Sequence, residues 1–235
     1  MRQLAGQLAL VTGASRGIGL AVSEALLAEG AHVLLCARSP QGLKSVAAGL
    51  SDRFGERVSA HACDVSDPAA VEELFLAARE RLGGLDILVN NAGVCHRGPI
   101  DELTPAQWRE TIDINLNGAF FCSRAAVPLL EPRRGFIVNV ASRAGINAFP
   151  GGAAYNASKF GMIGLSEAMI LDLRPRGIRV SYVMPGRVNT DFGGEDPEDW
   201  HLTTEDVAAA ILHALSYDER ALASRIELRP YRPPQ

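Results

Sequence analysis

Short apolar runs alternate with helix-length amphipathic segments from one end of the chain to the other, and this alternation restricts the fold more than any other feature. The apolar runs predict strands at 8–12, 32–37, 58–62, 87–90, 135–140, 179–183 and 225–228. Several runs are almost continuously apolar, which is typical of strands that are covered on both faces. The intervening segments predict helices around 17–29, 41–53, 68–82, 104–130, 152–173 and 204–216.

Strands that alternate with helices predict right-handed βαβ units and a parallel sheet. Pro68 and Pro105 each follow an Asp or a Thr that can cap a helix, as expected for Pro at a first helical position. The chain contains no repeat, no low-complexity segment and no linker rich in Pro, Gly and Ser. We therefore expect an α/β fold, with residues 1–235 in a single domain. Its core would be a Rossmann-like, doubly wound parallel sheet of about seven strands with helices on both faces.

Composition excludes several classes of function. A net charge of −4 and a pI near 5.8 give no basic surface for nucleic acid. No apolar run reaches the roughly 20 residues that span a membrane, and the first residues lack the features of a signal peptide. We expect a cytoplasmic protein without nucleic-acid or membrane partners. The four cysteines show no metal-ligand spacing, so we expect free thiols and no metal.

A glycine-rich segment connects the first predicted strand to the first predicted helix. In Thr12-Gly-Ala-Ser-Arg-Gly-Ile-Gly19 the glycines follow the spacing Gly-x-x-x-Gly-x-Gly. Glycines at such a turn permit a tight bend, let the backbone approach a pyrophosphate and allow the helix to pack on the strand. The helix N-terminus then presents N–H groups to the anion. This segment predicts dinucleotide binding by Gly13, Ser15, Arg16, Gly17, Ile18 and Gly19.

The end of the second predicted strand indicates which dinucleotide binds. NAD(H) usually meets an Asp or Glu there, which binds the free ribose 2′-hydroxyl. This strand instead ends in Ala37 and Arg38, without an acid. Arg38 and Arg16 can grip a 2′-phosphate through charge-assisted hydrogen bonds. The sequence therefore favours NADP(H) over NAD(H). The alternative is that Arg38 is only a solvated surface residue at the start of the next helix.

Tyr155 and Lys159 are four residues apart, a spacing that places two side chains on one face of a helix. A neighbouring ammonium favours the phenolate and should lower the pKa of Tyr155 toward a useful range for acid–base chemistry. Such a pair is common by chance, but Ser142 and the glycine-rich turn in the same chain make a catalytic interpretation stronger.

These segments together resemble the short-chain dehydrogenase/reductase family over essentially the whole chain, and an NADP(H)-preferring carbonyl reductase or 3-oxoacyl reductase in particular. Six motifs occur in the family's order: 12–19, Asp64-Val65, Asn90-Asn-Ala-Gly93, Asn115, Ser142 with Tyr155-x-x-x-Lys159, and Pro185-Gly-Arg-Val-Asn-Thr190.

The resemblance implies a catalytic set of Asn115, Ser142, Tyr155 and Lys159. Tyr155 would be the acid in carbonyl reduction and the base in alcohol oxidation, and Ser142 would donate a hydrogen bond to the substrate oxygen. Lys159 would lower the pKa of Tyr155 and hold the nicotinamide ribose. Asn115 would kink its helix and hold a water on Lys159.

The resemblance also implies further cofactor contacts. Asp64 would bind the adenine amino group, and Val188 with Thr190 would orient the carboxamide. The full implied set beyond the glycine-rich turn and Arg38 is Asp64, Val65, Asn91, Ala92, Gly93, Tyr155, Lys159, Pro185, Gly186, Val188 and Thr190.

The chain departs from many family members in its substrate lid, expected at about 186–203. This segment is short and holds five acids between residues 191 and 200, which should disfavour acidic partners such as an acyl carrier protein. Phe192 and Trp200 are candidates either to close over an apolar substrate or only to pack the lid. The remaining pocket candidates are Cys95, His96, Arg143, Ile146, Phe149 and Arg187, with His96 also consistent with a surface loop.

We expect an NADP(H)-dependent enzyme that acts on a small-molecule carbonyl or alcohol and forms a homodimer or homotetramer, as its relatives do. One alternative is a 3-oxoacyl-thioester reductase of lipid metabolism. Another is a non-catalytic NADP(H)-sensing regulator, but such proteins usually lose the Tyr or the Lys. An epimerase or dehydratase is disfavoured by the glycine spacing and the short C-terminal part.

Overall fold

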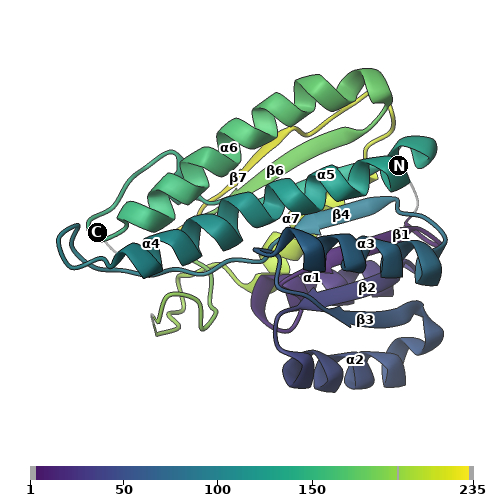
Figure 1. The fold of residues 1–235 in the computed structure, drawn as a ribbon, viewed down its shortest axis with the longest axis horizontal. Coiled ribbons are helices and arrows are strands. Elements are labelled where there is room, and N and C mark those ends of the chain that lie inside the picture. Colours follow the sequence, from purple (N-terminus) through teal and green to yellow (C-terminus); the bar gives the residue numbers. More distant parts are fainter. Residues whose placement is uncertain (1–3, 195, 233–235) are drawn as a thin grey trace.

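The computed structural model describes residues 4–194 and 196–232, so both ends of the predicted domain and Glu195 of the predicted lid lie outside the described residues. Within this part of the chain a parallel sheet has the strand order β3-β2-β1-β4-β5-β6-β7. Figure 1 shows the sheet and the helices that flank it. The strands are β1 Leu8–Thr12, β2 His32–Ala37, β3 Val58–Ala62, β4 Ile87–Asn90, β5 Phe136–Val140, β6 Arg179–Pro185 and β7 Arg225–Leu228.

The helices occupy the segments between the strands. They are α1 Gly17–Ala28, α2 Pro40–Phe54, α3 Pro68–Leu82, α4 Pro105–Ile112, α5 Gly118–Leu130, α6 Ala153–Leu173 and α7 Thr204–Ser216. The predicted helix over 104–130 is interrupted, because residues Asp113–Asn117 form a π-helical segment between α4 and α5. Capping explains the sharp starts: Thr104 and Gln107 form a capping box at α4, as Thr203 and Asp206 do at α7.

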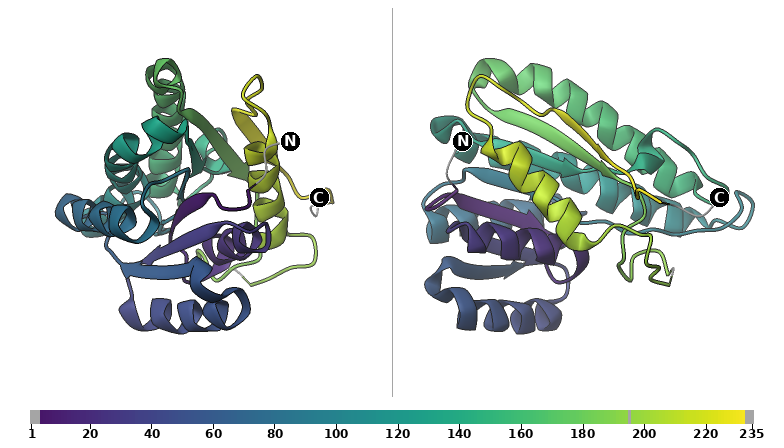
Figure 2. Two further views of the ribbon diagram at one scale, coloured as in Figure 1. Left: turned by 90° about the vertical axis from the view of Figure 1, so that its right-hand side faces the viewer. Right: turned by 180° about the vertical axis from the view of Figure 1, so that it is seen from behind.

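Each face of the sheet carries one hydrophobic core. Leu10 of β1 belongs to a core with α3, α5 and α6, whereas its neighbours Ala9 and Val11 point into a second core with α1, α2 and α7. This division follows from the alternation of side chains along a strand. Figure 2 shows the same layers from the side and from behind. The expected doubly wound fold with helices on both faces is confirmed.

The strand order reverses between β1 and β4, because β1 leads through α1 to β2 on one side while β4 continues to β5 on the other. In open α/β sheets a ligand crevice forms at the carboxyl ends of the strands at such a point. The glycine-rich turn follows β1 and the Asn-Asn-Ala-Gly segment follows β4, so both lie at this position.

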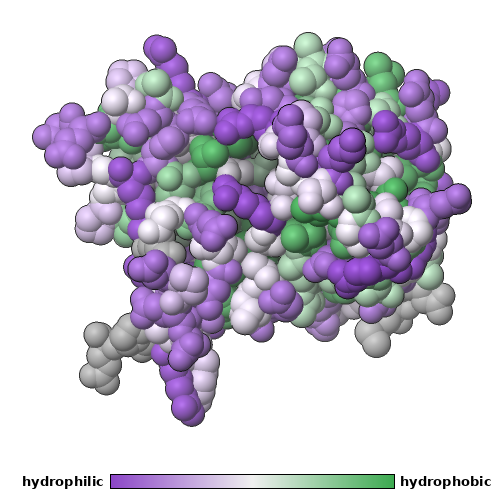
Figure 3. Space-filling view, turned by 90° about the horizontal axis from the view of Figure 1, so that it is seen from below, coloured by the Kyte–Doolittle hydropathy of each residue, from purple (hydrophilic) through white to green (hydrophobic). Residues whose placement is uncertain are grey.

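The face seen in Figure 3 is mostly hydrophilic, with smaller hydrophobic areas between polar side chains. Among the described residues no helix has the length and apolar character to span a bilayer. A cytoplasmic location remains a prediction of the sequence. All four cysteines are free thiols.

Candidate active site

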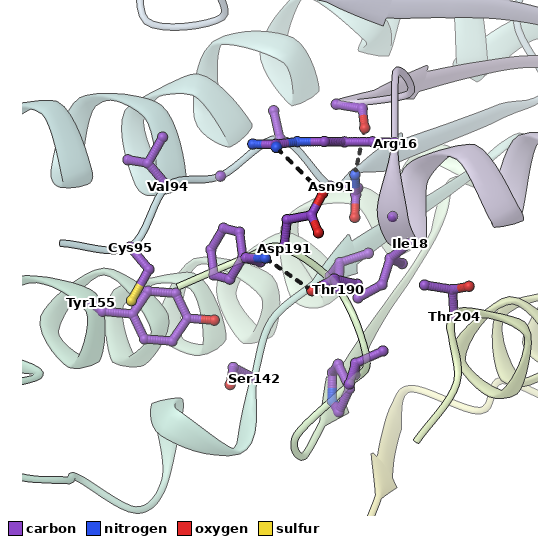
Figure 4. A pocket seen from close by; sticks show the side chains of 18 of the residues that line it. Arg16, Ile18, Asn91, Val94, Cys95, Ser142, Tyr155, Thr190, Asp191 and Thr204 are labelled. Atoms are coloured by element: carbon purple, nitrogen blue, oxygen red, sulfur yellow. Dashed lines mark hydrogen bonds and ion pairs between the residues drawn. The ribbon is translucent and has the colours of Figure 1, made fainter. Parts of the chain in front are cut away.

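A cavity of about 1100 Å³ lies at the carboxyl ends of β1, β2, β4, β5 and β6. It extends from Arg38 and Asp64 at one end to Tyr155 and Phe149 at the other. Figure 4 shows residues from the glycine-rich turn, α6 and the lid facing this one space. The predicted residues that line it are Gly13, Ser15, Arg16, Gly17, Ile18, Arg38, Asp64, Val65, Asn91, Ala92, Gly93, Ser142, Tyr155, Lys159, Pro185, Gly186, Val188 and Thr190.

The glycine-rich turn is locked to the loop after β4. Gly13 and Gly17 have φ values of +65° and +56°, a region that glycine enters without strain. The Asn91 side chain donates hydrogen bonds to the carbonyls of Thr12 at 3.0 Å and Gly13 at 3.2 Å. A Cβ at Gly19 would approach the Asn91 Nδ2 atom to 2.5 Å. Gly19 is therefore a packing residue behind the turn, and it does not line the cavity.

The N-terminus of α1 faces the cavity and suits an anion. Its first turn contains no acidic residue, and the residue before the helix, Arg16, makes no side-chain cap. The first backbone N–H groups of a helix without such a cap can bind a phosphate, with support from the helix dipole. Arg16 forms an exposed ion pair of 3.9 Å with Asp191 of the lid across the mouth of the cavity (Figure 4). The turn and helix therefore fit the pyrophosphate of a dinucleotide.

The other end of the cavity has the residues expected at an adenosine site. Cys63, Asp64 and Val65 follow β3, and Arg38 with Ser39 follows β2. The Asp64 Oδ1 atom accepts hydrogen bonds from the Ser66 backbone N–H at 3.0 Å and the Ser66 hydroxyl at 2.7 Å, which fixes the carboxylate in its loop. Arg38 lies at the end of β2, where an NAD(H)-binding chain would carry an acid.

Tyr155, Lys159 and Ser142 come together from two elements. Tyr155 and Lys159 belong to the start of α6, and Ser142 follows β5 directly before a short 3₁₀ turn, Arg143–Gly145. The Lys159 ammonium lies 5.7 Å from the centre of the Tyr155 ring and donates a hydrogen bond of 2.8 Å to the Val140 carbonyl. Figure 4 shows the Tyr155 ring with Cys95 beside it and Ser142 on the same side of the cavity. One buried cation and two hydroxyl groups thus share a small region.

The pKa values in this region differ from the sequence-based expectation. Burial raises the pKa of Tyr155 to about 12, and a hydrogen bond with Ser142 and the charge of Arg97 act in the opposite direction. Burial also lowers the pKa of Lys159 to about 8. The expected net lowering of the Tyr155 pKa is not found, since the penalty for placing a phenolate in the protein interior outweighs the lowering influences. The expected effect of Lys159 on this pKa stays a prediction.

Asn115 does not line the cavity. It is fully buried in the π-helical segment, where its Nδ2 donates to the Val94 carbonyl at 2.9 Å and to the Ser158 hydroxyl at 3.0 Å. Its Oδ1 accepts from the Val94 backbone N–H at 2.8 Å. Asn115 therefore joins the loop after β4 to the turn of α6 that carries Lys159. The π-helical segment interrupts the helix at this residue, and the expected kink stays a prediction.

Aromatic side chains surround Tyr155. The centre of its ring lies 6.3 Å from that of Phe149 and 5.8 Å from that of Phe192 in the lid. The Arg97 guanidinium stacks over Phe149 at 5.3 Å from the ring centre. Trp200 lies instead near Arg187 and His201 and does not line the cavity. Of the two lid aromatics, only Phe192 faces the space in front of Tyr155.

The other pocket candidates divide into two groups. Cys95, Arg143, Phe149 and Arg187 line the cavity, whereas His96 and Ile146 do not. His96 is hydrogen-bonded to Glu110 at 2.7 Å. Asn90 is buried and binds Asn139 and Ser123 through its side chain, which makes it a structural residue.

Several residues that line the cavity were not among those predicted from the sequence, and Arg97, Thr204 and Glu205 are polar examples. Arg97 follows Cys95 by two positions in an extended loop, so the same spacing that suggested Cys95 also indicates Arg97. Thr204 and Glu205 reach the cavity from the first turn of α7. The capping box of Thr203 and Asp206 marks the start of this helix, but no local signal shows that the helix begins beside the glycine-rich turn.

Comparison with known proteins identifies relatives over most of the chain. The family model described as short chain dehydrogenase matches residues 7–200. A 3beta-hydroxysteroid dehydrogenase from Mediterraneibacter gnavus is 35% identical over 92% of this chain and 91% of its own length.

Solved structures match the fold closely. An alcohol dehydrogenase from the archaeon Thermococcus sibiricus, complexed with 5-hydroxy-NADP, has a TM-score of 0.91 at 30% identity and covers 97% of this chain and 99% of its own. A short chain dehydrogenase from Burkholderia cenocepacia in complex with NADP has a TM-score of 0.89 at 33% identity, with 97% and 98% covered.

Proposed function

The chain belongs to the short-chain dehydrogenase family, and we propose that it is an oxidoreductase that transfers a hydride between NADP(H) and a carbonyl or alcohol substrate. One observation carries the proposal: the Tyr155, Lys159 and Ser142 side chains face the same cavity as the glycine-rich turn and the N-terminus of α1. A proton donor and a dinucleotide site in one space are what carbonyl reduction requires.

The cofactor proposal rests on the fit of the cavity. The turn from Gly13 to Gly17 and the first N–H groups of α1 would hold the pyrophosphate, and Arg38 with Arg16 would hold a 2′-phosphate. Two similar structures were solved with NADP or 5-hydroxy-NADP, which supports the same choice. Asp64 and Val65 would bind the adenine, and Asn91, Ala92 and Gly93 would line its ribose. The segment Pro185–Thr190 would orient the nicotinamide through Val188 and Thr190. When bound, NADPH supplies the hydride.

The residues of the chain would supply the proton and the electrostatics. In carbonyl reduction Tyr155 would donate its phenolic proton to the substrate oxygen while Ser142 donates a hydrogen bond to the same oxygen. A tyrosine phenol is protonated at neutral pH, as a proton donor must be, and the raised pKa of Tyr155 does not change this. Lys159 would hold the nicotinamide ribose and supply positive charge near Tyr155. Asn115 would support the start of α6 through its hydrogen bond with Ser158, and it would hold a water that passes protons to Lys159.

The surroundings of Tyr155 favour a substrate with an apolar body. The rings of Phe149 and Phe192 lie near the Tyr155 ring, and both residues line the cavity. A 3-oxoacyl thioester is the second substrate class, because its acyl chain would also contact these rings. A non-catalytic NADP(H)-sensing role is disfavoured, since Ser142, Tyr155 and Lys159 are all present at one place.

We further propose self-association as a homodimer or homotetramer through α4, α5 and α6. Large apolar side chains of these helices are exposed: Trp108, Phe120, Phe160 and Leu171. Exposed apolar groups that cluster on one side of a protein mark interaction surfaces. α6 also carries a row of small residues that a second helix could approach closely: Ala154, Ala157, Gly161, Gly164 and Ala168. Part of this row packs within the chain, because a Cβ at Gly161 would approach Leu116 to 2.7 Å. Gly164 has open space around it and remains available for a helix of a second subunit.

A substrate panel tests the proposed function. NADPH consumption would be followed at fixed protein concentration with cyclic ketones, aromatic ketones, quinones, 3-oxoacyl thioesters and sugars. We expect turnover with apolar ketones that depends on Tyr155. Binding of NADPH without turnover on any member of the panel would favour the sensing role.

A further inference from the structure

Arg38, the residue proposed to hold the cofactor's 2′-phosphate, already has an anionic neighbour. Its Nη1 atom lies 3.4 Å from the Oε1 atom of Glu110 on α4. The two residues are 72 positions apart in the sequence, and the contact connects the end of β2 with α4. The side chains are 62% and 39% exposed, so a solvent-borne phosphate can reach the guanidinium from outside. A carboxylate and a phosphate would therefore compete for the same N–H groups.

A second side chain holds Glu110 in this position. The Nε2 atom of His96 lies 2.7 Å from the other carboxylate oxygen, Oε2. Because one oxygen is held by His96, the remaining oxygen, Oε1, faces Arg38. The hydrogen bond with His96, followed by that with Arg38, keeps the pKa of Glu110 below its usual range. Glu110 is thus an anion at neutral pH.

Glu110 and His96 do not line the cavity, so any effect on the cofactor has to pass through Arg38. We propose that Glu110, oriented by His96, competes with the 2′-phosphate for Arg38 and thereby limits the preference of this site for NADP(H) over NAD(H). Glu110 is on this account a positioning residue that determines cofactor selectivity. The inference rests on the proposed role of Arg38.

The expected size follows from the exposure of the pair. Exposed ion pairs contribute up to about 1 kcal/mol, which corresponds to about a fivefold change in a dissociation constant. NADH has no 2′-phosphate and does not need Arg38. Its dissociation constant should therefore be insensitive to Glu110, and the ratio of the two constants isolates the effect.

The test measures the dissociation constants of NADPH and NADH by calorimetric titration for the wild type, Glu110→Gln, Arg38→Ala and the double variant. Glu110→Gln should tighten NADPH binding by about threefold, within the range of an exposed ion pair, and leave NADH unchanged. In the Arg38→Ala background the same change should have no effect. Glu80→Gln, an exposed charge removal in the last turn of α3, serves as the control for net charge.

The outcomes separate this inference from the proposed cofactor preference. If Arg38→Ala leaves the NADPH-to-NADH ratio unchanged, Arg38 does not hold the 2′-phosphate and the proposed preference fails with it. If Arg38→Ala weakens NADPH binding but Glu110→Gln leaves the ratio unchanged, the preference stands and the competition is refuted. An equal effect of Glu110→Gln with and without Arg38, or an equal effect of Glu80→Gln, also refutes it.

Discussion

The ammonium of Lys159 donates a hydrogen bond of 2.8 Å to the backbone carbonyl of Val140, the last residue of β5. This contact ties the start of α6 to the end of a central strand two residues before Ser142. It therefore fixes the position of Tyr155, on the preceding helical turn, relative to Ser142. The same contact holds a cation that is only 4% exposed.

Burial of this cation predicts a pH dependence of stability. The pKa of Lys159 is lowered to about 8 from an ordinary value of 10.5. Between pH 8 and 10 the unfolded chain binds more protons at this position, so raising the pH should increase the free energy of unfolding. From pH 8 to pH 10 the free energy of unfolding of the wild type should rise by roughly 2 kcal/mol more than that of a Lys159→Met variant. This figure follows from about 1.4 kcal/mol per pKa unit. Urea unfolding at several pH values measures it.

Lys44 is the matched control, since it is an exposed residue of α2. Lys44→Met should leave the slope of stability against pH unchanged. If the free energies of unfolding of the wild type and Lys159→Met change with pH in parallel between pH 8 and 10, the pKa of Lys159 is not lowered in the folded chain.

Cofactor selectivity should follow the charge at the end of β2. The double variant Ala37→Asp, Arg38→Ala removes the proposed phosphate ligand and adds an acceptor for a ribose 2′-hydroxyl. We expect the ratio of kcat/KM for NADPH to that for NADH to fall by at least about 100-fold, because two charge-assisted contacts change together. Steady-state kinetics with both cofactors on one substrate tests this. An unchanged ratio would argue against a 2′-phosphate held by Arg38.

The glycine-rich turn should tolerate no side chain at Gly19. A Cβ there would collide with the Gly13 carbonyl and approach the Asn91 Nδ2 atom to 2.5 Å. Gly19→Ala should therefore lower the free energy of unfolding by about 1–3 kcal/mol, as overpacking usually does. Gly49→Ala in α2 is the control, since nothing lies within 4 Å, and it should stabilise by up to about 1 kcal/mol. Equal thermal shifts for both variants would contradict the packing role.

Self-association should depend on the exposed face of α6. Phe160 is 48% exposed, and Phe160→Arg places a charge in the proposed contact. Light scattering coupled to size-exclusion chromatography should report an oligomer for the wild type and a monomer for this variant. Leu76→Arg on α3 alters an apolar residue outside that face and should leave the oligomer intact. An oligomer that survives Phe160→Arg would place the contact elsewhere.

The fold was predictable because each element carries its own local signal. Apolar runs marked the strands, and the capping residues Asp67 and Thr104 before Pro68 and Pro105 marked helix starts. The π-helical segment was not predictable as such, because its cause is tertiary: Asn115 bonds to Val94 and Ser158, far along the chain. In this segment the Asn115 side chain contacts both the loop after β4 and α6.

The candidate site was predictable in its residues but not in its energetics. Motif spacing indicated Tyr155, Lys159 and Ser142, and these side chains line one cavity. The direction of the Tyr155 pKa depends on how deeply the phenol is buried, which no spacing reports. The contacts of Glu110 with Arg38 and His96 likewise join three segments whose proximity appears only once the sheet is assembled.

Turnover by Tyr155→Phe tests the central claim most directly. This change removes one hydroxyl and keeps the ring between Phe149 and Phe192, so NADPH should bind with about the wild-type dissociation constant. Loss of the proton donor should reduce kcat by at least about 100-fold on any active substrate of the panel. Tyr217→Phe, at the end of α7 and outside the cavity, should retain full activity. A Tyr155→Phe variant with wild-type kcat would contradict the proposed mechanism.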